Sequence, residues 1–236
     1  MNLLLLHPDD LTGDQHAVIA GRRLQHLHEV HRAETGQTLR AGLLGGAMGH
    51  ARIEQLDAQQ ARLQLTLDQT PPAKLPLTLI LALPRPKMLK RTLQTIAAMG
   101  VQKLVLVNSV RVEKSFWQTP WLSPEAIHEQ LLLGLEQACD TVLPEVILEK
   151  RFKPFVQDRL PALAADSLKL VAHPGEHPEC PRALGTQPLT LAIGPEGGWI
   201  PYEVNLLQEA GFAPVQLGPR ILRVETAVPA LIARLY

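Results

Sequence analysis

Two glycine-containing loops near the C-terminal end of the chain carry residue types that could hold a ligand. Gly194–Gly198, with the sequence Gly-Pro-Glu-Gly-Gly, follows the apolar run 189–193 and precedes a segment with helical spacing, 201–210. Because glycine has no Cβ, the main chain of such a loop can come close to a bound molecule. Leu217–Arg223 has the same placement between an apolar run and a helical pattern. Together the two loops predict one composite binding site.

The spacing of the first loop excludes the common phosphate-binding motifs. Gly194–Gly198 lacks the glycine spacing of dinucleotide-binding folds and the Lys-Ser/Thr pair of a P-loop. Pro195 also removes a main-chain donor where a phosphate cradle would need one. A nucleoside-like ligand held by main-chain groups and apolar walls fits better. An ordinary glycine-rich turn between a strand and a helix is the alternative interpretation.

Charged side chains flank the second loop, at Arg220, Arg223 and Glu225. One interpretation is a buried structural Arg–Glu pair. The other places Arg223 against a developing negative charge near the glycine loops, since a guanidinium group stays charged and offers a planar set of donors. No Ser–His–Asp or Cys–His arrangement can be assigned. Trp199, directly after the first loop, is expected to pack in a wall or in the core.

Basic residues are concentrated in two parts of the chain. Residues 85–114 contain seven Lys or Arg and one acidic residue, a formal excess of +6 in a chain of net charge zero. Such a patch can bind a phosphodiester backbone, although a solvated helix face explains it equally well. The second area lies near the N-terminus and combines Arg22, Arg23, Arg32 and Arg40 with His16, His26, His28 and His31. These histidines have no recognisable metal-ligand spacing, so no metal site is predicted.

The composition is that of a folded globular protein, because 46% of the 236 residues are hydrophobic and 19% are charged. Cys139 and Cys180 have neither a CxxC nor a His–Cys spacing, so we expect two unpaired thiols in a reducing compartment. The N-terminal apolar run is too short for a signal peptide. No stretch approaches the ~20 apolar residues of a membrane span. We therefore expect a soluble, cytoplasmic protein that is not bound to a membrane.

A proline-rich connector, Thr70–Pro76, divides the chain into two domains. Before the connector, short and partly alternating apolar runs predict strands at 39–44, 52–56 and 63–67. A turn at Gly45-Gly46 and a short helix at 21–30 complete a small β-rich domain, residues 1–71.

Residues 72–236 alternate apolar runs with helical patterns, which predicts an α/β domain with a mostly parallel sheet. The expected strands are 77–83, 104–107, 146–148, 168–172, 189–193 and 215–217, and the expected helices are 87–99, 123–138, 154–160, 201–210 and 224–235. Ser123-Pro124-Glu125 resembles an N-cap, a proline at the first helical position and an acidic first turn. Since ligands bind beyond the carboxyl ends of parallel strands, the loops at 172–175, 194–198 and 218–223 are expected to converge.

These residues resemble the motifs of one known family. Ile193–Gly198, followed by Leu217–Arg223 and Glu225-Thr-Ala227, is similar in order and spacing to the RsmE family of SPOUT-class methyltransferases, which methylate N3 of a uridine in 16S rRNA. The resemblance is weaker in the N-terminal half, where His26-Leu27, Val30, Arg32 and Gly36 are similar to part of the family's PUA-like RNA-binding domain. Further matches are Arg85, Gln94, Gly100-Val101, Glu136-Gln137 and Pro144-Glu145.

The resemblance implies a SPOUT-type parallel sheet with a C-terminal trefoil knot, preceded by a small PUA-like β-barrel domain. It also implies a homodimer that acts on 16S rRNA or the small ribosomal subunit. The cofactor would be S-adenosylmethionine, held by Ala172, His173, Gly194, Pro195, Gly197, Gly198, Leu217, Gly218, Leu222 and Val224. Glu196 or Glu225 would accept the proton of uridine N3, and Arg223 would stabilise the negative charge of the base. RNA would be bound by Arg32, Arg85, Lys87 and Arg111.

The chain departs from the family pattern at Thr95, Ala98, Asp140 and Val224, where the family commonly has Lys, Glu, Arg and Thr. These departures leave two alternatives open. One is a SPOUT methyltransferase with a different RNA target. The other is a non-catalytic RNA-binding relative that keeps the fold.

Overall fold

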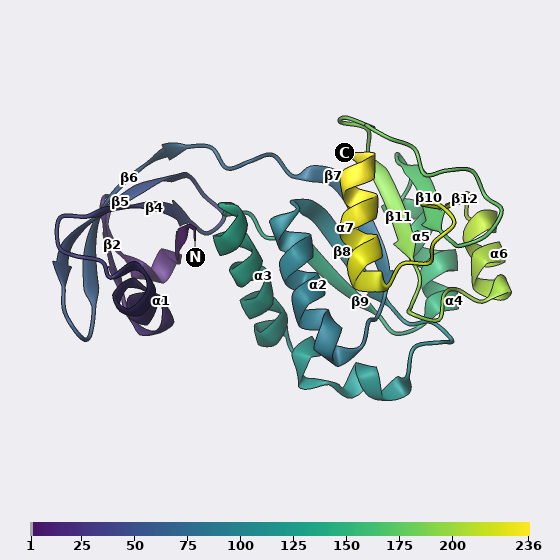
Figure 1. Ribbon diagram of the computed structural model, residues 1–236, viewed down its shortest axis with the longest axis horizontal. Helices are drawn as coiled ribbons and strands as arrows, with labels where there is room; N and C mark the ends of the chain where they lie inside the picture. Colours follow the sequence, from purple (N-terminus) through teal and green to yellow (C-terminus); the bar gives the residue numbers. More distant parts are fainter. Residues whose placement is uncertain (1) are drawn as a thin grey trace. The chain divides into compact units, whose positions relative to one another are not determined.

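The computed structural model describes residues 2–236, which form two compact units (Figure 1). The first contains the chain up to Ala73 together with Leu132–Leu143, and the second contains Lys74–Leu131 and Pro144–Tyr236. The sequence places the domain boundary between residues 71 and 72. The structure divides the chain close to that point and also groups 132–143, the last part of helix α3 (Pro124–Ala138) and the loop after it, with the first unit.

A six-stranded sheet forms the first unit, in the order β1-β4-β5-β6-β3-β2. β1 and β4 are parallel, and the other neighbouring strands are antiparallel. The bounds are β1 (Leu4–Leu6), β2 (Leu11–Gly13), β3 (His16–Ile19), β4 (Thr38–Leu43), β5 (Met48–Leu56) and β6 (Ala61–Gln69). The strands expected at 39–44, 52–56 and 63–67 are confirmed as parts of β4, β5 and β6. The sheet fits a barrel-like N-terminal domain.

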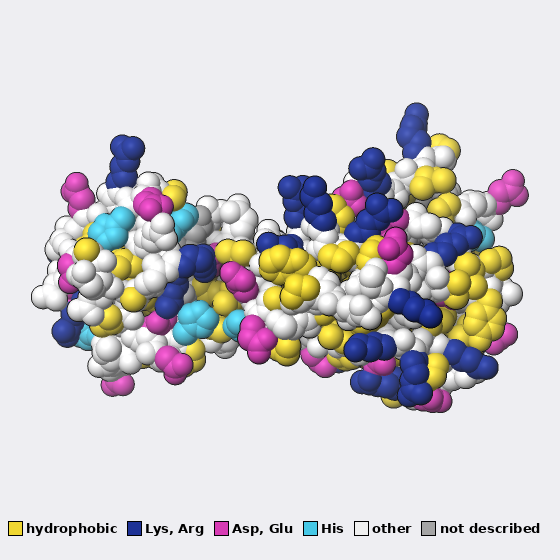
Figure 2. Space-filling view, turned by 90° about the horizontal axis from the view of Figure 1, so that it is seen from below, with side chains coloured by type: hydrophobic (Ala, Val, Ile, Leu, Met, Phe, Trp, Pro, Cys, Tyr) yellow, Lys and Arg dark blue, Asp and Glu magenta, His cyan; other side chains and the backbone are white. Residues whose placement is uncertain are grey.

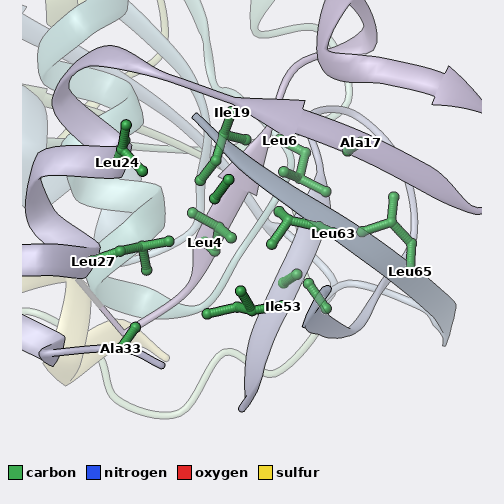
Figure 3. Close-up of a cluster of buried hydrophobic side chains, with 13 residues drawn as sticks. Leu4, Leu6, Ala17, Ile19, Leu24, Leu27, Ala33, Ile53, Leu63 and Leu65 are labelled. Atoms are coloured by element: carbon green, nitrogen blue, oxygen red, sulfur yellow. The ribbon is translucent and has the colours of Figure 1, made fainter. Parts of the chain in front are cut away.

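The core of the first unit follows from the alternation of its strands. Along β6, Ala61, Leu63 and Leu65 are buried while the residues between them are exposed. Helix α1 (Gly21–His26) contributes Leu24 and continues as a π-helical turn, Leu27–His31, that contributes Leu27. Figure 3 shows these side chains meeting Leu4, Leu6, Ile19 and Ile53 in one apolar cluster. The helix expected over 21–30 therefore forms, with a wider last turn.

The second unit contains a six-stranded sheet in which all neighbouring strands are parallel, in the order β12-β10-β11-β7-β8-β9. The bounds are β7 (Leu75–Ala82), β8 (Val101–Val107), β9 (Glu145–Glu149), β10 (Leu168–Ala172), β11 (Leu189–Ile193) and β12 (Ala213–Val215). Every residue of β11 is buried, as expected of a central strand covered on both faces. The α/β class and the parallel sheet predicted from the sequence are confirmed.

Helices connect the strands of the second unit. The α-helices are α2 (Pro86–Ala98), α3, α4 (Phe152–Pro154), α5 (Leu160–Leu163), α6 (Pro201–Glu209) and α7 (Val224–Leu235), with a π-helical segment at Phe155–Arg159. In the second unit, 3₁₀ turns lie at Lys114–Gln118 and Pro120–Leu122, and another, Pro8–Asp10, lies in the first unit. The N-cap of α3 is confirmed, because the Ser123 hydroxyl accepts a hydrogen bond from the main-chain N–H of Ala126 at 3.2 Å. Helices α2 and α7 pack against each other (Figure 1).

Candidate functional site

The carboxyl ends of three adjacent strands in the second unit open into one cavity. The loops that follow β10, β11 and β12 contribute residues 172–175, 193–199 and 215–222 to its lining, and α7 contributes Val224, Ala227 and Leu231. The cavity has a volume of about 490 Å³, within the usual range for a small-molecule site. Most of the lining is glycine, proline and aliphatic side chains. The convergence of these loops, expected from the sequence, is therefore present.

All ten residues predicted to hold the cofactor line this cavity: Ala172, His173, Gly194, Pro195, Gly197, Gly198, Leu217, Gly218, Leu222 and Val224. Sequence reasoning missed Ala227 and Leu231. The signal that could have found them is helical spacing, because positions three and seven residues after Val224 lie on the same face of α7.

The three candidate catalytic residues have different surroundings. Glu196 lines the large cavity. Arg223 is the N-cap residue of α7 and is exposed, outside the lining. Its exposure is incompatible with a buried structural Arg–Glu pair. Glu225 lines a smaller cavity of about 240 Å³ between α2 and α7, which also includes Thr95, one of the departures from the family pattern.

The glycine loop is tightly folded against an aromatic wall. Gly198 has φ +73° and donates its N–H to the carbonyl of Pro195 at 2.7 Å. A Cβ on Gly194 would lie 3.0 Å from the main-chain nitrogen of Trp199 and 3.1 Å from its Cδ1. Trp199 is 2% exposed and its ring lies 5.4 Å from that of Phe152. The expectation that Trp199 packs in a wall is therefore confirmed.

Within residues 2–236, two buried side-chain nitrogens lack a hydrogen-bond partner, His173 Nδ1 and Trp199 Nε1. Both residues line the large cavity. Burial lowers the pKa of His173, and the positive charges of His177 and Arg111 lower it further. His173 is therefore neutral at neutral pH. A buried polar group without a partner is costly, so these two nitrogens mark the cavity wall as a place where stability has been given up.

Glu196 is in contact with the start of α2. The main-chain N–H of Arg85 donates to Glu196 Oε1 at 3.5 Å, and Arg85 Nε lies 3.9 Å from the same oxygen. The Arg85 side chain is 66% exposed, so this ion pair contributes little to stability. Glu196 thus lines the cavity and makes only long contacts, of 3.5 and 3.9 Å, to Arg85.

The candidate RNA-binding residues are distributed over both units. Arg32, in the first unit, is exposed and follows the π-helical turn with φ +48°. Arg85 and Lys87 lie at the start of α2 and are exposed, and Arg111 follows β8 and donates a hydrogen bond to the carbonyl of Gly197. Figure 2 shows several groups of Lys and Arg side chains on the second unit and most of the visible histidines on the first.

Within residues 2–236, no group of three or more His, Cys, Asp or Glu side chains is arranged to hold a metal ion. No helix in this range is both long enough and apolar enough to cross a membrane.

Known proteins resemble this chain over most of its length. The family described as RNA methyltransferase domain matches residues 71–236. Ribosomal RNA small subunit methyltransferase E of Treponema pallidum is 29% identical, with 99% of this chain and 90% of that protein aligned. The crystal structure of the enzyme of that name from Neisseria gonorrhoeae, bound to S-adenosylmethionine, has a TM-score of 0.76 and 26% identity, covering 99% of this chain and 95% of that one. A protein from Legionella pneumophila in complex with the same cofactor has a TM-score of 0.75 and 25% identity, with coverages of 98% and 94%.

Proposed function

The chain belongs to the RNA methyltransferase family, and we propose that it transfers the methyl group of S-adenosylmethionine to N3 of a uridine in 16S rRNA. Methylation of rRNA with S-adenosylmethionine is the activity of this chain, since full-length relatives are named small subunit rRNA methyltransferases and a solved one binds that cofactor. The choice of uridine N3 rests on the resemblance of the two glycine loops to the RsmE motifs. The observation that carries the proposal is the meeting of these loops at one cavity.

The cavity fits S-adenosylmethionine chemically. Apolar walls suit the adenosine, and the lining includes His173 and Trp199, whose Nδ1 and Nε1 atoms are buried without a hydrogen-bond partner. Gly194 leaves no room for a Cβ, so the main chain itself forms the wall. When bound, the cofactor supplies an electrophilic methyl group on its sulfonium. A neutral His173 would add no second positive charge to the lining of the cavity that holds the sulfonium.

The protein must move one proton and stabilise one charge. N3 of neutral uracil is protonated, so its proton would pass to a carboxylate when the methyl group leaves the sulfur of the cofactor and bonds to N3. Glu196 lines the cavity and is better placed for this role than Glu225, which faces the smaller cavity. Arg223, exposed at the start of α7, would stabilise the negative charge on uracil O2 and O4.

Arg223→Ala tests the charge-stabilising role. We expect methyl transfer to fall by ~10²-fold or more while S-adenosylmethionine binds normally, because the lost interaction forms mainly in the transition state. Arg182→Ala is a matched control, since Arg182 is exposed in the same unit and does not line the cavity. Full methylation by Arg223→Ala would remove Arg223 from the mechanism.

Several features of the family accompany this proposal. The three loops at 172–175, 193–199 and 215–222 would form a trefoil knot. Its support is that the last helix ends against an earlier loop, where the N–H of Leu184 donates to the carbonyl of Leu235 at 2.7 Å. The first unit would be a PUA-like domain that binds rRNA through Arg32. The protein would act as a homodimer in the cytoplasm, and analytical ultracentrifugation tests the dimer.

The target is tested by nucleoside mass spectrometry of 16S rRNA from cells with and without the gene. Loss of N3-methyluridine on deletion supports the proposal. Loss of another methylated nucleoside would favour a SPOUT methyltransferase with a different target, and mapping of reverse-transcription stops would locate the base. Calorimetric titration with S-adenosylmethionine separates both from a non-catalytic RNA-binding relative, which would not bind the cofactor.

A further inference from the structure

A buried carboxylate outside the cavity lining joins two loops at the carboxyl ends of the parallel strands, the end of the sheet at which the cavity lies. Glu203 is in the first turn of α6 and is 1% exposed. Its Oε1 accepts a hydrogen bond from the main-chain N–H of Val110 at 2.8 Å. Its Oε2 accepts from the hydroxyl of Ser109 and from the main-chain N–H of Ile200, both at 3.1 Å. One side chain therefore satisfies three donors.

The three donors come from distant parts of the sequence. Ile200 is the N-cap residue of α6 and ends the glycine loop. Ser109 and Val110 follow β8 and belong to a compact turn, in which the N–H of Val112 donates to the carbonyl of Ser109 at 3.0 Å. A glutamate at the third helical position often caps its own helix, which explains only the bond to Ile200. The other two bonds fix the 109–112 turn relative to the start of α6.

The same turn reaches the cavity through Arg111. Its guanidinium donates to the carbonyl of Gly197, which lines the cavity, and a Cβ on Gly197 would lie 2.9 Å from Arg111 Cδ. The Arg111 side chain is exposed, and a long arginine side chain has many rotamers. The Arg111 side chain can reach Gly197 only if the main chain of the 109–112 turn is correctly placed. The hydrogen bonds of Glu203 fix that main chain.

We propose that Glu203 is a positioning residue for the cofactor site. It fixes the 109–112 turn relative to the start of α6. Arg111, which belongs to this turn, thereby keeps Gly194–Gly198 in its binding conformation. This inference rests on the proposed function, because the probe of the cavity is S-adenosylmethionine.

Two substitutions of Glu203 separate its hydrogen bonds to the 109–112 turn from its capping bond to Ile200. Glu203→Asp keeps an acceptor near Ile200, but its shorter side chain cannot also reach the 109–112 turn. Glu203→Gln keeps the length but replaces one acceptor oxygen by an NH₂ group, which then faces a main-chain N–H of Val110 or Ile200. Both variants therefore leave at least one buried donor unpaired.

The experiment is calorimetric titration of the full chain with S-adenosylmethionine, well below the unfolding temperature. We expect the Kd to rise about tenfold in both variants, since the loss of one hydrogen bond to a carboxylate has that magnitude. Thr190→Val is the control. It removes the buried hydrogen bond between Ser167 and Thr190 (2.7 Å) at the opposite end of β11, so it lowers stability and leaves the Kd unchanged.

A double-mutant cycle with Arg111→Ala tests whether Glu203 affects the glycine loop through Arg111. If Glu203 acts through Arg111, Glu203→Asp changes the Kd much less in the Arg111→Ala background than in the wild type. Equal effects in both backgrounds, or a wild-type Kd in folded Glu203→Asp, would overturn the proposal. If both Glu203 variants fail to fold, Ser109→Ala is measured instead. A raised Kd for S-adenosylmethionine supports the positioning role of Glu203, and an unchanged Kd rejects it. A wild-type chain that binds no S-adenosylmethionine would instead refute the proposed function.

Discussion

Arg22 and Glu136 form a two-point ion pair within the first unit, with Nη2 2.5 Å from Oε1 and Nη1 3.0 Å from Oε2. The Glu136 side chain is 4% exposed, whereas that of Arg22 is 48% exposed. The carbonyl of Glu136 also accepts hydrogen bonds from the main-chain N–H groups of Asn2 and Leu3, at 3.1 and 3.0 Å. Residues 132–143 are therefore bound to the N-terminal part of the chain by both side-chain and main-chain contacts.

Arg22→Ala is expected to destabilise the first unit. The substitution leaves a buried carboxylate without its main partner, which we expect to cost about 2–3 kcal/mol because water can still reach the half-exposed side of the pair. Denaturant unfolding measures this loss. Arg62→Ala is the control, since Arg62 pairs with Glu54 at 3.4 Å across an exposed surface and its loss should cost less than about 1 kcal/mol. Equal losses in the two variants would contradict the argument.

Burial determines how much of the fold can be read from the sequence. The last four residues of β7 and of β8, and all of β11, are buried, so each strand contains a mostly apolar run that is visible by itself. β1 was missed because it has only three residues and pairs with β4, more than thirty positions later in the chain. Such a pairing depends on the tertiary structure and leaves no local pattern.

The candidate site likewise contains residues that a local sequence pattern reveals and residues that only the tertiary structure reveals. The glycine loops were predicted because each follows a strand, and the carboxyl ends of parallel strands share one edge. The direction of Arg223 could not be predicted, because it depends on the N-cap conformation of α7. Glu203 was overlooked because a helical glutamate usually faces solvent, and only the fold brings it to Ser109.

The affinity for S-adenosylmethionine is expected to fall in acid. The pKa of His173 is lowered from 6.5 by burial and by the neighbouring His177 and Arg111, so the ring is neutral at pH 7 and becomes protonated below pH 6.5. Protonation then adds a positive charge to the lining of the cavity that would hold the positively charged cofactor. Calorimetry from pH 5 to pH 8 should show constant affinity above pH 7 and a decline below about pH 6.5.

His173→Asn should flatten this pH profile, while His128→Asn, on an exposed position of α3, should leave it unchanged. Stability follows the same direction: the unfolded chain binds the proton first, so the contribution of His173 is full above pH 6.5 and is lost as the pH falls. Because the pKa of His26 is also lowered, the binding profile is the cleaner measurement. An unchanged profile in His173→Asn would exclude His173 as the cause.

Two alanine substitutions in the glycine loop should differ in their effect on stability. In Gly194→Ala the new Cβ meets the main chain and ring of buried Trp199 at 3.0–3.2 Å, so the wall must shift at a cost of about 1–3 kcal/mol. In Gly197→Ala the three nearest atoms belong to the exposed side chain of Arg111, which can move aside, and the change should stay within about 0.5 kcal/mol. Thermal unfolding compares the two, and equal destabilisation would contradict the difference between a fixed wall at Trp199 and a movable side chain at Arg111.

The hydroxyl of Tyr236 makes the stability of the second unit depend on pH in the alkaline range. Its hydroxyl donates to the carbonyls of Pro76 at 3.3 Å and Gln187 at 3.2 Å, and burial raises its pKa from 10.0 to about 12. The unfolded chain loses this proton near pH 10, whereas the folded chain keeps it until about pH 12. The folded state therefore binds more protons in that window, and its stabilisation is complete below pH 10 and lost as the pH rises to about 12.

Tyr236→Phe tests this directly. At pH 7 the variant should lose about 1 kcal/mol, because the two carbonyls lose a donor. Between pH 10 and about 12 the difference in unfolding free energy from the wild type should shrink, since only the wild type carries the titrating hydroxyl. The pKa of buried Cys180 is also raised, but its contribution is common to both proteins and cancels. Tyr202→Phe, at a half-exposed position of α6, should match the wild type throughout, and a constant gap for Tyr236→Phe across the alkaline range would refute the assignment.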